Sequence, residues 1–107
     1  MVAEGRRAAC DEGTVVVSPY SIIEGVDAAA CQLLGYAASD LIGQHGSMLV
    51  PREAQPSTAA SIDRMRRGEI DVRVGRLITR DGSEIGVQVR SRQLPDGRLA
   101  LTLRQTA

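Results

Sequence analysis

The chain of 107 residues lacks phenylalanine and tryptophan, and its only aromatic side chains are Tyr20 and Tyr36. Its core must therefore be built from Val, Ile, Leu, Met and Ala, which offer no flat rings for stacking. Recognition of single-stranded nucleic acid by base stacking is nearly excluded for this reason. A flavin or another flat cofactor would also lack ring partners.

An excess of either charge is also missing, because thirteen basic and thirteen acidic residues cancel. No overall field attracts nucleic acid or an anionic membrane, so neither is expected as a partner. The chain has one histidine, His45, and shows no Ser-His-acid arrangement and no glycine-rich phosphate loop. We therefore predict that it is not an enzyme and holds no metal.

The two cysteines, Cys10 and Cys31, do not have the spacing of metal ligands. A disulfide between them remains open, but two cysteines without a secretion signal favour a reducing cytoplasm. No stretch approaches the roughly 20 apolar residues of a membrane span. The expected location is cytoplasmic, without contact to a membrane.

Three segments have helical character. Residues 1–13 form a weak amphipathic stretch, interpreted as an N-terminal helical cap or linker. Asp27 is a good N-cap for the alanine-rich run that Gly35 ends, and a further short turn follows. A longer helix is expected from Ser57, which would cap it, to Gly68.

Alternating apolar and polar residues predict the strands. Two short strands precede the helices, and three follow them, separated by Arg-Asp-Gly and Pro-Asp-Gly turns that are typical of hairpins. The expected strands are residues 14–18, 20–25, 71–79, 83–94 and 98–105. This order predicts an α+β domain over residues 14–107, with a five-stranded antiparallel sheet and with short helices and one longer helix over one face.

Several short motifs, in order, resemble those of PAS domains, which are sensory modules of bacterial signalling proteins. They are the stretches DAAACQLLGY, DLIGQ, MLVPRE and TRDGSEIGVQV. The resemblance covers residues 14–107 and implies the five-stranded sheet, homodimer formation and an attached effector domain. It also implies a role in a sensor kinase, a transcription regulator or a cyclic-dinucleotide enzyme.

The resemblance is nearest to heme-type PAS domains, yet the ligand position differs. In that branch a histidine follows the proline that aligns with Pro51, and here the position is Thr58; another branch uses the position of Val50. Where flavin-type members carry a reactive cysteine, this chain has Gly46. His45 is interpreted as an exposed turn residue, so neither heme nor flavin is expected.

A small apolar cavity between the helices and the sheet would hold any ligand, either an apolar molecule or a short carboxylate. The candidate pocket residues are Leu33, Leu41, Met48, Thr58, Ile62, Met65, Arg76, Leu77, Val87 and Leu101. Arg76 has two interpretations. It is a pocket cation if the face of Val72, Val74 and Ile78 points inward, and it is exposed if Gly75 and Leu77 do.

The opposite face of the sheet carries polar side chains and arginines that form either a hydrated surface or a contact with a second subunit or an effector. The candidates are Gln88, Arg90, Arg92, Thr102 and Arg104. The sequence thus predicts a sensory or regulatory module that binds a small ligand, mediates dimerisation, or does both. The alternative is a ligand-free interaction module whose core is filled.

Overall fold

Five strands form a single antiparallel sheet in the order β2-β1-β5-β4-β3. The computed structural model describes residues 12–106. The strands are β1 (Glu12–Val17), β2 (Ile23–Val26), β3 (Val72–Ile78), β4 (Glu84–Gln93) and β5 (Leu99–Gln105). The predicted α+β class and five-stranded antiparallel sheet are confirmed.

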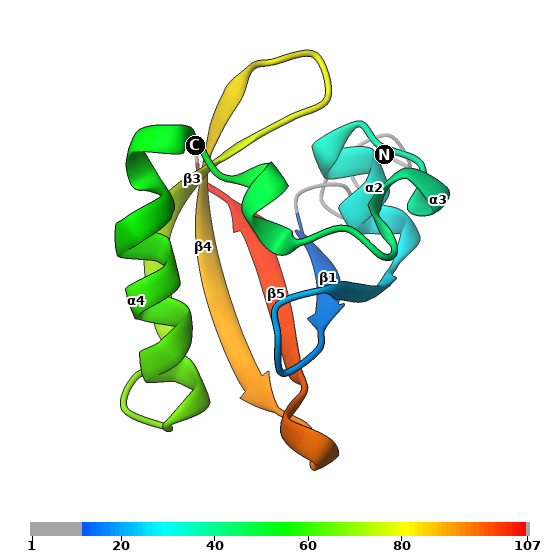
Figure 1. Cartoon of the computed structure of the whole chain (residues 1–107). Helices are drawn as coiled ribbons and strands as arrows, with labels where there is room; N and C mark the ends of the chain where they lie inside the picture. Colours follow the sequence, from blue (N-terminus) through cyan, green and yellow to red (C-terminus); the bar gives the residue numbers. More distant parts are fainter. Residues whose placement is uncertain (1–11, 107) are drawn as a thin grey trace, which may run out of the picture.

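The helical segments lie mainly between β2 and β3 in the chain. They are α2 (Ala28–Leu34), α3 (Ala38–Leu41), η1 (Gly46–Leu49), η2 (Arg52–Ala54) and α4 (Gln55–Arg66), and η3 (Pro95–Gly97) joins β4 to β5. Figure 1 shows α4 running along β3 and β4, whereas α2 and α3 lie beside β1. Different helices therefore cover the β1 side and the β3–β4 side of the sheet.

Helix α2 begins and ends as its sequence predicts. The Asp27 carboxylate accepts hydrogen bonds from the N–H groups of Ala30 at 2.8 Å and Thr14 at 3.1 Å, which ties the helix start to β1. Gly35 ends the helix with φ 82°, a conformation that favours glycine. Gly13 on β1 has no side chain, and this allows the backbone of Ala30 to approach closely.

Helix α4 begins earlier than predicted. Its first residue is Gln55, with Pro56 in the first turn, and no side chain caps it. The Ser57 hydroxyl donates to the carbonyl of Ala54 at 3.1 Å, so Ser57 lies inside the first turn and does not serve as the N-cap. Proline fits this position because the first-turn N–H groups have no helical partner. The predicted stop at Gly68 is confirmed by its φ of 76°.

The segment before β2 is a turn and not part of the strand. The Ser18 hydroxyl accepts hydrogen bonds from the N–H groups of Tyr20 and Ile22, each at 3.1 Å, and Ser21 has φ 64°. The second strand consequently begins at Ile23, three residues later than predicted. Most of the expected N-terminal segment 1–13 lies outside the described residues, but its last two residues belong to β1.

The hydrophobic core lies between the helices and one face of the sheet. On β5 the inward side chains Leu99, Leu101 and Leu103 are buried, which confirms the apolar face predicted from alternation. No helix within residues 12–106 has the length and apolar character needed to cross a membrane.

Candidate ligand-binding site

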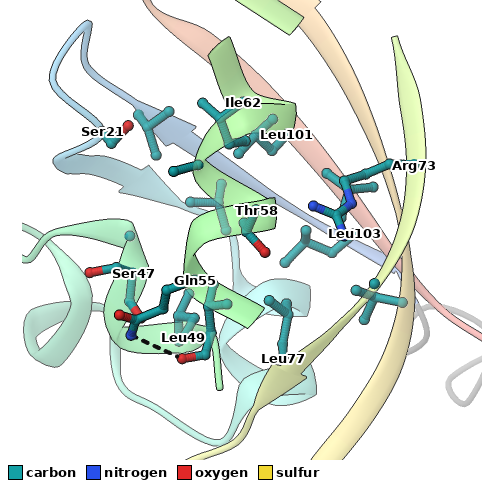
Figure 2. Close-up of a pocket in the computed structure, with 18 of the residues that line it drawn as sticks. Ser21, Ser47, Leu49, Gln55, Thr58, Ile62, Arg73, Leu77, Leu101 and Leu103 are labelled. Atoms are coloured by element: carbon teal, nitrogen blue, oxygen red, sulfur yellow. Dashed lines mark hydrogen bonds between the residues drawn. The ribbon is translucent and has the colours of Figure 1, made fainter. Parts of the chain in front are cut away.

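A cavity of about 230 Å³ lies between the inner sheet face and the segments η1 and α4. Every strand contributes to its walls, and α4 covers it with Thr58, Ala59 and Ile62. Figure 2 shows side chains from these elements around the cavity, with Leu101 close to Ile62 and Leu103 close to Arg73 in this view. Its volume corresponds to about eight water-sized groups at roughly 30 Å³ each.

The wall on the sheet side is aliphatic. It is formed by the inward residues of three adjacent strands, which are Val15, Val17, Val87, Val89, Leu101 and Leu103. All are less than a tenth exposed. Such a surface favours apolar groups by removing them from water and offers no ring for stacking.

Polar groups gather toward the N-terminal half of α4. The Gln55 side-chain amide donates to the carbonyls of Ser47 at 3.2 Å and Val50 at 3.3 Å, which joins the helix start to η1. Thr58 lies one turn farther along the helix and lines the cavity. Arg73 reaches toward this region from β3, and Figure 2 shows its guanidinium directed toward Thr58.

Six of the ten predicted pocket residues line this cavity. These are Thr58, Ile62, Arg76, Leu77, Val87 and Leu101. Their role in ligand binding remains a prediction, but the structure brings them together from α4, β3, β4 and β5.

The other four predicted pocket residues lie elsewhere. Leu41 and Met65 are 0% and 1% exposed within the packed core, and Met48 is packed against that core. Leu33 borders a separate, shallower depression beside Arg80. These four side chains do not line the cavity, and the sequence could not separate them from those that do, because an aliphatic residue satisfies a filled core as well as a cavity wall.

Arg73, and not Arg76, is the cation that points into the cavity. The inward positions of β3 are Arg73, Gly75 and Leu77, so the second interpretation of this strand is correct. Arg76 touches the rim, but its guanidinium contacts Glu84 at 2.7 Å and Glu53 at 3.7 Å, and its side chain is 52% exposed.

The position that corresponds to the heme ligand, Thr58, lies in the cavity wall and presents a hydroxyl instead of an imidazole. His45 lines the mouth of the cavity, where its Nδ1 accepts the N–H of Ser47 at 3.1 Å. This contact makes His45 the N-cap of η1, which provides a structural role for the side chain. No group of three His, Cys, Asp or Glu side chains within residues 12–106 could hold a metal ion.

The predicted contact residues on the opposite sheet face lie close together. Arg90 is aligned with Thr102, and Gln88 with Arg104, across β4 and β5. Arg90, Arg92 and Arg104 are exposed and form no ion pair with another residue of the described range 12–106. Two valines of β3 extend this face: Val72 is 38% exposed and Val74 is 66% exposed.

The five-stranded sheet with helices over one face is the fold that a comparison with known families also identifies. A family model described as the PAS fold matches residues 8–100, so the chain belongs to the PAS family. The resemblance seen in the sequence is thereby confirmed. No curated protein matches the sequence.

Solved structures of PAS domains share the fold. A domain of the sensory box sensor histidine kinase/response regulator from Geobacter sulfurreducens is 23% identical, with a TM-score of 0.76 over 96% of this chain and 93% of that one. The RpfR quorum-sensing receptor PAS domain of Cronobacter turicensis, in complex with C12:0, is 12% identical, with a TM-score of 0.78 over 91% and 95%.

A third structure is similar over one part of a longer chain. The EL346 blue-light activated histidine kinase of Erythrobacter litoralis is 11% identical with a TM-score of 0.79, and the match covers 98% of this chain but 36% of the kinase. At these identities the likeness establishes the fold only, and the ligand must be argued from the residues of this chain.

Proposed function

We propose that this PAS domain is a non-catalytic sensory module of a larger bacterial cytoplasmic signalling protein, and that its cavity binds a small apolar or carboxylate ligand. The observation that carries the proposal is the cavity of about 230 Å³ with its aliphatic wall. Pockets of this kind bind by burial of apolar surface, and a few polar groups orient the ligand.

The attachment of α4 suggests how ligand binding would be transmitted. At its C-terminal end, Arg66 donates to the carbonyls of Ser18 at 2.7 Å and Gly97 at 2.9 Å. The side-chain amide of Gln93 donates to the carbonyls of Met65 at 3.2 Å and Arg66 at 3.0 Å. The N-terminal half, above the cavity, is held by the weaker contacts of Gln55. A ligand would displace this half against the sheet and shift the balance between two states of a dimer or effector contact.

Native mass spectrometry of freshly purified protein tests this function. We expect a retained small molecule, or uptake of one after incubation with short aliphatic compounds. A protein that neither retains nor takes up such compounds would contradict the sensor proposal.

A second candidate function is a ligand-free module for homodimerisation. It is favoured by the exposed Val72 and Val74, which adjoin the arginines of β4 and β5 on the outer sheet face. An apo dimer in the same mass spectrum would support this function, and Val74→Asp should then weaken the dimer. A monomer at high micromolar concentration would exclude it.

A further inference from the structure

We infer that the cavity is a site for an aliphatic monocarboxylate whose carboxylate binds Arg73 beside Thr58, while its chain lies against the valines and leucines of the sheet. This inference rests on the proposed function and makes the ligand class specific. Three observations support it: the weak hydrogen bonds of the Arg73 guanidinium, the glycine two residues farther along the same strand, and the size of the cavity.

The Arg73 guanidinium has unused hydrogen-bonding capacity. Within the described part of the chain it has no carboxylate partner, and its two hydrogen bonds, to the carbonyls of Ser57 and Val74, are both 3.4 Å long. An arginine has five N–H donors in a planar fork, and bonds of this length are weak. Nearby Arg76, in contrast, contacts two carboxylates.

Gly75 allows the guanidinium of Arg73 to lie over β3 on the cavity side. A Cβ on Gly75 would be 3.2 Å from Nη2 of Arg73, so an added side chain would require the guanidinium to shift by a few tenths of an ångström. The half-buried cation therefore borders an aliphatic wall without an anion from the described residues beside it. A carboxylate matches the fork geometry and would neutralise the charge in a partly desolvated site.

Asp63, an acidic residue that also lines the cavity, determines the orientation. It lies five residues beyond Thr58 on α4, which places it about 7.5 Å farther along the helix axis. A carboxylate at the Thr58 end keeps its distance from Asp63. The ligand chain then extends over Val87 and Leu101, both of which line the same cavity.

The volume sets the size of the part of a ligand that the cavity encloses. At roughly 30 Å³ per non-hydrogen group, 230 Å³ holds about eight groups, which is the number in hexanoate. Molecules this small bind weakly even when they fit well. Nuclear magnetic resonance titration is therefore the appropriate measurement.

The test compares hexanoate, 1-hexanol and hexylamine in titrations of the 15N-labelled chain at pH 7. We expect hexanoate to bind about tenfold more tightly than 1-hexanol, and hexylamine to bind most weakly. The preference should disappear in Arg73→Gln and persist in part in Arg73→Lys. Arg80→Gln is the matched control, since Arg80 is an exposed arginine beside the other depression.

Each other outcome contradicts a defined part of the inference. Equal binding of hexanoate and 1-hexanol would overturn the carboxylate class but leave the apolar cavity intact. Binding of none of the three would overturn both this inference and the sensor proposal. A preference that survives in Arg73→Gln would place the carboxylate elsewhere.

A second measurement does not require a substituted protein that folds. In the unmodified protein, hexanoate should shift the Nε–H resonance of Arg73, whereas 1-hexanol should leave it nearly unchanged. Shifts of equal size with both compounds would contradict the role of Arg73.

Discussion

The two sides of the inner sheet face are covered by helices in different ways. Beside β1, the side chains of Ala30, Leu34 and Leu41 from α2 and α3 are 0% exposed, and packing is tight. Beside β3 and β4, α4 buries only Met65 near its C-terminal end, and a cavity remains under its N-terminal half.

Side-chain size explains much of this difference. Gly13 and Ala30 allow α2 to lie close against β1. On the other side, Thr58 of α4 and Gly75 of β3 both line the cavity, and these short residues do not fill the space. Interiors are otherwise close-packed, and this space of about 230 Å³ is the basis of the proposed ligand site.

The largest expected effect comes from disturbing the packed side with Gly13→Ala. The new Cβ would overlap the backbone nitrogen and Cα of Ala30, so one element must move. We expect a loss of about 3 kcal/mol or more in the free energy of unfolding, measured by urea denaturation. Gly25→Ala is the control, because its Cβ would meet only Val16 at 3.8 Å. Equal losses in both variants would contradict tight packing of α2 on β1.

The same substitution on α2 and on α4 is expected to have different costs. Ala30→Leu should destabilise the protein by about 2 kcal/mol, because a fully buried site has no room for the added atoms. Ala59→Leu, at an exposed position that borders the cavity, should change the free energy of unfolding by no more than about 0.5 kcal/mol. Similar costs for the two variants would contradict open space at this position of α4.

The anchoring of α4 at its C-terminal end is tested by Arg66→Met. This change removes hydrogen bonds to Ser18, Ser21 and Gly97 while keeping most of the apolar stem, and should cost about 2 kcal/mol. Arg67→Met, which removes an exposed pair with Glu69, should have little effect. If the two variants unfold alike in urea, the anchor has been assigned to the wrong side chain.

A smaller effect is expected at the β3–β4 hairpin, which lies outside the cavity. The hydrogen bonds donated by the hydroxyl of Thr79 and the N–H of Ser83 hold the pKa of Asp81 below its ordinary value of 3.8. A lowered pKa stabilises the folded state above pH 3.8, and this contribution is lost as the pH falls through the folded-state pKa. The drop in Tm between pH 5 and pH 2.5 should therefore be smaller in Asp81→Asn than in the unmodified protein. An unchanged drop would exclude this contribution.

The fold was predictable because its signals are local and agree with one another. Alternation marked β4 and β5, Asp-Gly turns marked their hairpins, and Asp27 with Gly35 bounded α2. The start of α4 was missed because Ser57 resembles a cap, whereas its hydroxyl donates to Ala54 within the first turn.

The site was less predictable because it depends on where α4 lies above the sheet. Ile62 and Met65 are one turn apart and equally apolar, yet the first lines the cavity and the second is buried in the core. Arg73 was missed because Val72 and Val74 suggested the wrong inward face for β3. Arg73, Gly75 and Leu77 alternate on one face of β3, and this was the available signal. It could be interpreted only once Val72 and Val74 were known to point outward.

A crystal structure of the protein under xenon pressure would show directly whether the space under α4 is an apolar cavity, because xenon enters apolar cavities and avoids filled cores. We expect xenon between α4 and the sheet, in contact with Ile62, Val87 and Leu101, and none beneath α2. A structure in which side chains fill this space, or in which xenon binds only elsewhere, would show that no such cavity exists.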